Sequence, residues 1–245
     1  MSKTIVITGA GVGLGRALAR RFAADGEQVV LLGRTYSKVE AAAQEIGEQA
    51  LAMECDVASP DSVRAAFEAI DRRHPQIDVL INNAAIFEPF QIVDARDEQI
   101  VNTVAINLAG PMLCARAAIP RMTRGAIIIN VTSESVDLPF PHLAVYQSTK
   151  AGLERFSASL LRELEPQGIR VTNVRAGSMY EEGKTWDVDP AAAMAFRDAA
   201  AAAGLNLLER PISQFGSVTG IFRTLIDLPP DLQVAGVGLH ARRPD

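Results

Sequence analysis

Short, nearly continuous apolar runs recur along this chain, and they constrain its fold more than any other feature. The runs are TIVIT (4–8), VVLL (29–32), IDVLIN (77–82), GAIIINV (125–131) and IRVTNV (169–174). Strands of this composition are buried on both faces, which is typical of a parallel sheet covered by helices. Alanine-rich helical stretches separate the runs. The alternation predicts an α/β fold, a single-domain doubly wound parallel sheet with helices on both faces.

The composition indicates one large soluble domain. The 245 residues are 48% hydrophobic and 22% charged, and no linker or repeat interrupts them, so we expect one domain over 1–245. A formal net charge of −5 without a basic run gives no electrostatic argument for nucleic acid or an anionic membrane. Cys55 and Cys114 lack metal-ligand spacing. Because we find neither a signal peptide nor a run of membrane-spanning length, we expect a cytoplasmic protein without a metal.

The first apolar run leads into a glycine-rich turn, TGAGVGLG (8–15). Gly9, Gly13 and Gly15 fall between a strand and an amphipathic helix, which is the context that a dinucleotide site requires. Glycines let the backbone approach a pyrophosphate, whose charge meets the free N–H groups at the helix N-terminus. The turn therefore predicts a nucleotide cofactor, although turns also use glycine for structural reasons alone.

The second apolar run is followed by Gly33, Arg34 and Thr35. A site that prefers NAD(H) usually offers a carboxylate at this point to the ribose 2′-hydroxyl. The Arg34 guanidinium instead suits a 2′-phosphate, although it could equally be a solvated arginine at a helix start. Val12 occupies a position where a second basic residue would have strengthened the argument. The pattern favours NADP(H), with NAD(H) as the alternative cofactor.

The stretch YQSTK (146–150) places a phenol and an ammonium four residues apart. On a helix, Tyr146 and Lys150 would share a face, and a cation beside a phenol favours the phenolate. This pairing suits acid–base chemistry. In the structural alternative, Tyr146 packs in a core while Lys150 pairs with Glu154 in solvent.

Taken together, these motifs resemble the short-chain dehydrogenase/reductase family as far as about residue 180. The family's TGxxxGxG matches residues 8–15, its NNAG matches NNAA (82–85), and its YxxxK matches Tyr146 and Lys150. Its catalytic asparagine corresponds to Asn107, its catalytic serine to Ser133, and its adenine-side acid to Asp56. The resemblance implies a Rossmann-type NAD(P)-binding domain and an NADP(H)-dependent oxidoreductase that interconverts a carbonyl and an alcohol in a small molecule.

The resemblance also implies a role for each of the four catalytic residues. Tyr146 would be the general acid or base at the substrate oxygen. Lys150 would lower the pKa of that tyrosine and bind the nicotinamide ribose, and Ser133 would hold the substrate oxygen. Asn107 would hold a water that relays protons, although it could instead kink or cap a helix. The implied cofactor-binding residues are Gly9, Val12, Gly13, Leu14, Gly15, Arg34, Thr35, Asp56, Val57, Asn83, Ala84, Ala85, Tyr146, Lys150, Gly177 and Met179.

The chain departs from the family pattern at several positions. Ala85 stands where glycine is usual, Ala176 where proline is usual, and Glu181 where a threonine contacts the carboxamide. The C-terminus lacks the usual pair of glycines. These departures leave open a catalytically silent nucleotide-sensing or scaffold protein on the same fold. A Rossmann-like methyltransferase is a further alternative.

The segment 178–211 joins a polar loop to an alanine-rich helix after the last predicted strand, so it is either a substrate lid or a plain surface helix. The pocket beside it would draw on residues 134–145 and on Phe140, His142, Met179, Tyr180 and Trp186, with His142 more typical of a surface loop.

By resemblance, we expect a homodimer or homotetramer that pairs helices near 97–118 and 144–164. The second helix has apolar residues that could serve either this interface or the monomer core: Leu153, Phe156, Leu160, Leu161 and Leu164.

Overall fold

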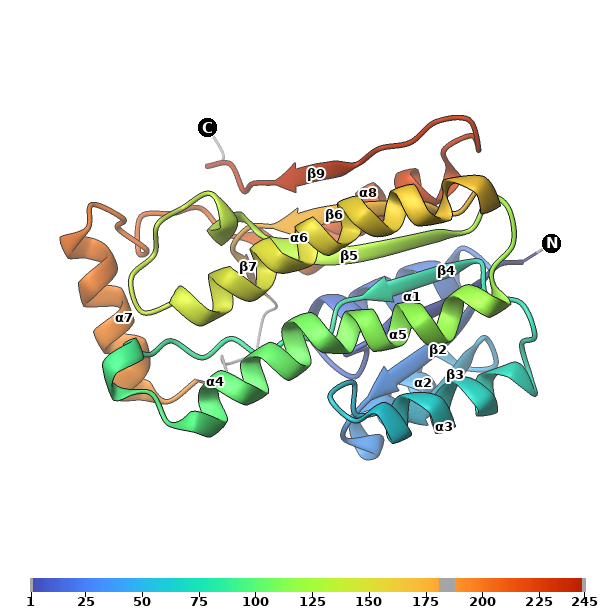
Figure 1. Ribbon diagram of the computed structural model, residues 1–245, viewed down its shortest axis with the longest axis horizontal. Coiled ribbons are helices and arrows are strands. Elements are labelled where there is room, and N and C mark those ends of the chain that lie inside the picture. Colours follow the sequence, from blue (N-terminus) through green and yellow to red (C-terminus); the bar gives the residue numbers. More distant parts are fainter. Residues whose placement is uncertain (1, 181–187, 244–245) are drawn as a thin grey trace.

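The computed structural model describes residues 2–180 and 188–243. Seven parallel strands form one sheet in the order β3-β2-β1-β4-β5-β6-β9, with helices on both faces (Figure 1). This confirms the predicted doubly wound parallel sheet. The strands are β1 (Thr4–Thr8), β2 (Gln28–Gly33), β3 (Ala50–Glu54), β4 (Val79–Asn82), β5 (Ile127–Ser133), β6 (Arg170–Ala176) and β9 (Gly236–Leu239).

The central strands are buried along their whole length, as their apolar composition predicts. Every residue of β1, β4 and β5 is buried. Ile7 of β1 pairs in parallel register with Leu31 of β2 on one side and with Ile81 of β4 on the other. The order of the strands reverses between β1 and β4, and ligands in sheets of this kind bind beyond the carboxyl ends of the strands at such a point.

Two helical layers cover the sheet. One face packs against α1 (Gly13–Ala24), α2 (Tyr36–Ile46) and α8 (Phe215–Asp227), with Phe22 and Phe222 fully buried there. The other face packs against α3 (Pro60–Asp71), α5 (Gly110–Ala118) and α6 (Ala144–Leu164). Both layers hold their apolar residues against the sheet, which separates the two main hydrophobic clusters.

The long helix α6 directs its apolar residues into this core. Leu153, Leu160 and Leu164 are buried, and Phe156 and Leu161 are partly buried against the same cluster. This outcome agrees with the monomer-core alternative. The apolar content of α6 is therefore no evidence for a subunit interface.

The stretch Asp97–Arg121 corrects one expectation from the sequence. It comprises α4 (Asp97–Val104), a π-helical turn (Ala105–Ala109), α5 and a short 3₁₀ turn. By length and composition alone, with a mean hydropathy of 1.2 in its most apolar window, this stretch could cross a membrane. Core helices of globular proteins meet the same criterion, and here the stretch packs against α3 and α6. A single such helix is weak evidence for a membrane span.

The segment predicted as a lid contains a helix at the carboxyl end of the sheet. Helix α7 (Pro190–Ala202) begins with Asp189, whose carboxylate accepts a hydrogen bond of 2.9 Å from the Ala192 N–H. Figure 1 places α7 beyond the ends to which the central strands point. Two short strands, β7 (Met179–Tyr180) and β8 (Ser213–Gln214), flank this segment and pair with each other. Glu181 and Trp186 lie outside the described residues.

Candidate active site

The glycine-rich turn joins β1 to α1 in a conformation that requires its glycines. Gly9 and Gly13 adopt φ angles of +66° and +58°, a region that side chains disfavour. Gly15 lies in the first turn of α1, where a Cβ atom would come within 2.5 Å of the Gly9 carbonyl oxygen. Gly15 therefore lets the helix pack closely on the turn and does not itself line the cavity. The turn leaves a hollow over the N-terminus of α1, as an anionic group would need.

Hydrogen bonds fix this turn to the loop that follows β4. The Thr8 hydroxyl accepts hydrogen bonds of 3.0 Å from the N–H groups of Asn83 and Ala84. The Asn83 side chain donates in return to the carbonyl oxygen of Thr8 at 3.0 Å. The first and fourth strands thus hold their carboxyl-end loops in one rigid unit. This unit gives a structural reason for the motifs TG (8–9) and NNA (82–84) in the sequence.

A cavity of about 330 Å³ lies over these loops, at the point where the strand order reverses. Gly9, Gly13 and the N-terminus of α1 at its wall offer the backbone groups that the pyrophosphate of a dinucleotide needs. The Asp56 carboxylate lies at its wall and accepts a hydrogen bond of 3.0 Å from the Ala58 N–H. The predicted cofactor residues that line this cavity are Gly9, Val12, Gly13, Leu14, Arg34, Thr35, Asp56, Val57, Asn83, Ala84 and Ala85.

Two exposed cations, Arg34 and Lys38, line the same cavity. Arg34 follows β2 and precedes α2, and Lys38 lies in the first turn of α2. A Cβ atom on Gly11 would come within 2.9 Å of the Lys38 Cβ, which places the base of this lysine against the glycine turn. Among the described residues, neither side chain has an ion-pair partner. The sequence reasoning missed Lys38, and the only available signal was a second cation shortly after Arg34.

The predicted serine and tyrosine meet at the carboxyl end of β5. Ser133 ends that strand, and its hydroxyl accepts a hydrogen bond of 3.1 Å from the Ser135 N–H. Tyr146 lies in the first turn of α6, close enough to the Ser133 side chain for that hydroxyl to influence the phenol. Burial raises the pKa of the Tyr146 phenol, while the Ser133 hydroxyl acts in the opposite direction. The phenol is therefore held in its protonated form.

Lys150 lies next to this pair. Its Nζ atom is 5.7 Å from the centroid of the Tyr146 ring and donates a hydrogen bond of 2.9 Å to the Val131 carbonyl oxygen. Burial lowers the pKa of Lys150 to about 8, and burial is also the largest influence on the pKa of Tyr146. The lowering of the tyrosine pKa by Lys150 stays a prediction. The alternative that pairs Lys150 with Glu154 in solvent is wrong.

Asn107 is fully buried in the π-helical turn between α4 and α5. Its side chain accepts a hydrogen bond of 2.8 Å from the Ile86 N–H and donates one of 2.9 Å to the Ile86 carbonyl oxygen. Each end of the amide therefore makes a hydrogen bond to the backbone of Ile86, so Asn107 anchors the loop after β4. The water-holding role of Asn107 stays a prediction. Pro111 lies four residues later and has no N–H to offer the Asn107 carbonyl, which accounts for the irregular helix.

Comparison with known proteins connects this geometry to a family. The family profile described as short chain dehydrogenase matches residues 3–185, which is most of the chain. The chain belongs to the short-chain dehydrogenase/reductase family. Carbonyl reductase family member 4 of Danio rerio is 33% identical over 184 residues, covering 74% of this chain and 78% of that protein. Family membership places this chain among the oxidoreductases.

Solved structures of the short-chain dehydrogenase/reductase family share the whole architecture. A short chain dehydrogenase from Burkholderia cenocepacia, in complex with NADP, is 25% identical with a TM-score of 0.82, covering 97% of this chain and 96% of that one. A 3-ketoacyl-(acyl-carrier-protein) reductase from Brucella melitensis, complexed with NADH, is 26% identical with a TM-score of 0.80 and the same two coverages, 97% and 96%. Both nicotinamide cofactors thus occur among these relatives.

Three further residues predicted at the site, Gly177, Met179 and His142, lie near the segment that the sequence predicts as a lid. Gly177 approaches β9 so closely that a Cβ atom would come within 2.5 Å of the Leu239 carbonyl oxygen. Met179 begins β7 and packs at the edge of the core. Neither residue lines the glycine-loop cavity. His142 has a φ angle of +62° in the loop before α6, and its carbonyl oxygen accepts a hydrogen bond of 2.8 Å from the Phe90 N–H.

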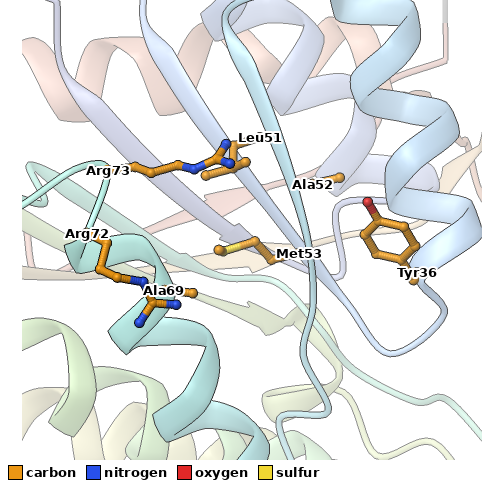
Figure 2. Close-up of a pocket in the computed structure, with 7 residues that line it drawn as sticks. All are labelled: Tyr36, Leu51, Ala52, Met53, Ala69, Arg72 and Arg73. Carbon is orange, nitrogen blue, oxygen red and sulfur yellow. The ribbon is translucent and has the colours of Figure 1, made fainter.

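A separate cavity of about 410 Å³ lies beside the edge strand β3. Figure 2 shows Tyr36 of α2 on one side of that strand, with Arg72 and Arg73 toward the other. This cavity shares no residue with the glycine-loop cavity. It is therefore separate from the glycine-loop cavity.

Proposed function

We propose that the protein is an NADP(H)-dependent oxidoreductase that interconverts a carbonyl and an alcohol, with Tyr146 as the general acid or base. The observation that carries the proposal is the grouping of Tyr146, Ser133 and the buried Lys150 at the same edge of the sheet as the glycine-loop cavity. The phosphate-accepting turn and the proton-donating group thus belong to one rigid framework. The substrate carbonyl group would bind between the phosphate-accepting turn and the proton-donating Tyr146.

The residues around the glycine-loop cavity would hold the cofactor. The turn from Gly9 to Gly13 would face the pyrophosphate, and Asp56 would lie toward the adenine. Arg34 and Lys38 support NADP(H) over NAD(H), because two cations without an ion-pair partner among the described residues favour a 2′-phosphate and no carboxylate follows β2. Lys38 thereby supplies the second cation that Val12 does not. When bound, the reduced nicotinamide supplies the hydride.

The chain's own residues handle the proton. Reduction adds a hydride to the carbonyl carbon and a proton to its oxygen, leaving an alcohol and the oxidised cofactor. Tyr146 donates that proton, and its raised pKa keeps the phenol protonated until the substrate oxygen gains charge. Ser133 donates a hydrogen bond to the same oxygen. Lys150 returns a proton towards Tyr146, helped by a pKa of about 8 that lies near working conditions.

The relay role proposed for Asn107 falls on its main-chain carbonyl, since the side-chain amide is engaged with Ile86. Pro111 leaves that carbonyl without its ordinary helical donor. A water bound there would lie in the π-helical turn beside α6, where Lys150 is found.

The substitution Tyr146→Phe tests the proposal. It removes the donated proton while keeping the ring, so we expect NADPH consumption with a panel of aldehydes and ketones to fall by about 100-fold or more. NADPH binding, measured by fluorescence, should change little. Ser148→Ala, an exposed position two residues away, is the matched control and should keep full turnover.

A catalytically silent protein on the same fold remains the competing hypothesis. It predicts NADPH binding without turnover of any carbonyl compound, and no difference between the native chain and Tyr146→Phe. A methyltransferase would bind no nicotinamide dinucleotide. We further propose a cytoplasmic homodimer or homotetramer, as resemblance implies.

A further inference from the structure

The side chains around Tyr146 are aromatic. The Phe87 ring meets Tyr146 edge-on, with the ring centroids 5.2 Å apart. Phe196 of α7 meets Phe87 edge-on at 5.8 Å, and Phe140 lies 6.0 Å from Phe196. The four rings come from the loop after β4, the loop after β5, α6 and α7. The ring of the proposed proton donor is thus one of a group of four aromatic rings in successive contact.

Aliphatic side chains pack around the four rings, and we call the whole group the aromatic cluster. Leu143 is buried within it, and Leu138, Leu205 and Leu207 pack against it. Helix α7 turns Phe196 inward, while Met194 on the same helix is 56% exposed. The lid helix thus contributes an apolar side chain to the region of the proton donor.

Among the cations beside the aromatic cluster, the guanidinium groups are paired with carboxylates, and Lys150 donates a hydrogen bond to the Val131 carbonyl oxygen. Arg210 pairs with the buried Glu134 at 2.7 Å and stacks over Phe140, with its Cζ atom 5.4 Å from the ring centroid. Arg175 pairs with Glu154 at 2.6 Å and also with Asp137. Within residues 2–180 and 188–243, the guanidinium groups that adjoin the cluster are therefore not free to bind a substrate carboxylate or phosphate. Burying such an anion against aromatic rings without a counter-ion would be unfavourable.

We propose that the substrate is a carbonyl compound whose substituents are uncharged and apolar, such as an aryl or branched alkyl ketone or aldehyde, and not an oxo acid. The inference rests on the proposed function and specifies its substrate class. Apolar substituents gain from burial against the aromatic cluster, and an aryl group gains further from edge-to-face contact.

A matched pair of substrates tests this directly. Acetophenone and benzoylformate differ only in carrying a methyl group or a carboxylate on the carbonyl carbon. With the native enzyme at saturating NADPH, kcat/KM should be at least tenfold higher for acetophenone, although the carboxylate makes benzoylformate intrinsically more electrophilic. Equal or faster reduction of benzoylformate would overturn the inference and leave the proposed function standing. No turnover of either compound, or of a wider carbonyl panel, would overturn the proposed function and the inference with it.

Variants on the two faces of α7 locate the effect. Phe196→Ala should raise KM for acetophenone at least fivefold with little change in kcat, because it removes part of the aromatic cluster and leaves the proton donor in place. Phe196→Leu, which keeps most of the apolar bulk, should restore at least half of the native affinity and guards against a folding defect. Met194→Ala changes an exposed side chain on the same helix and should leave KM unchanged. A native KM in Phe196→Ala would contradict the placement of substrate against this ring.

Discussion

At the scale of single residues, Lys150 combines a functional position with an energetic cost. Only 3% of the residue is exposed, and its one hydrogen bond goes to a backbone carbonyl, so the ammonium is poorly solvated. Burial accordingly lowers its pKa from 10.5 to about 8. The folded chain without cofactor thus retains a charge that it would be more stable without. Such local instability is typical of sites selected for chemistry.

The substitution Lys150→Met should therefore stabilise the cofactor-free protein while abolishing turnover. Because the lowered pKa disfavours the charged form in the folded state, the native chain is penalised below about pH 8, and the penalty disappears as pH rises towards 10.5. The stability advantage of Lys150→Met should thus shrink by about 2–3 kcal/mol between pH 7 and pH 10. Denaturant unfolding across that range measures it. Lys38→Met, at an exposed lysine, is the control, and an equally flat pH profile for both variants would contradict the account.

At the scale of elements, the π-helical turn between α4 and α5 is hydrogen-bonded to the loop after β4. Asn107 makes this connection through two hydrogen bonds to the backbone of Ile86, and the same loop contributes Asn83 to Ala85 to the cofactor cavity. The π-helical turn thus helps to hold the loop after β4, which Thr8 also holds through its hydroxyl group. Local irregularities in helices often occur at functional sites for this reason.

Replacing Asn107 with leucine should destabilise the protein by about 2–4 kcal/mol, because two buried backbone groups of Ile86 lose their partners. NADPH binding should weaken as the loop loosens. Asn102→Leu, an exposed position on α4, should change stability by less than about 0.5 kcal/mol. If both variants unfold at the same denaturant concentration as the native protein, Asn107 does not anchor the loop.

The sequence was sufficient to predict those elements whose side chains carry strong local signals. Strands buried on both faces, such as β1 and β5, can be recognised in the sequence by continuous apolar runs. The edge strands β3 and β9 cannot be recognised in this way, because their sequences, ALAME and GVGL, are only partly buried and contain few β-branched residues. Motif spacing brought Ser133, Tyr146 and Lys150 together correctly. It could not reveal that burial raises the pKa of Tyr146, since burial depends on the whole fold.

At the scale of the whole molecule, several exposed apolar residues lie on and just before α4. Val101 and Val104 of α4 are 62% and 40% exposed, and Val93 just before α4 is 81% exposed. The proposed subunit contact therefore draws support from α4 and the segment before it, and not from α6.

Light scattering of the purified protein should give at least twice the mass of the 26.2 kDa chain. Val101→Glu places a charge on the exposed face of α4 and should shift the mass towards the monomer, because a buried unpaired charge disfavours association. Asn102→Glu alters the neighbouring polar position and should not. A native protein that is monomeric at micromolar concentration would contradict the oligomer proposal.

The central claim is that this family member uses NADP(H), and a calorimetric titration with NADPH and with NADH tests it most directly. We expect NADPH to bind at least about tenfold more tightly, since Arg34 and Lys38 can each make a charge-assisted hydrogen bond to the 2′-phosphate. Arg34→Asp should reverse the preference, because a carboxylate repels the phosphate and accepts from the ribose hydroxyls. Tighter binding of NADH to the native protein, or unchanged NADPH affinity in Arg34→Asp, would contradict the account.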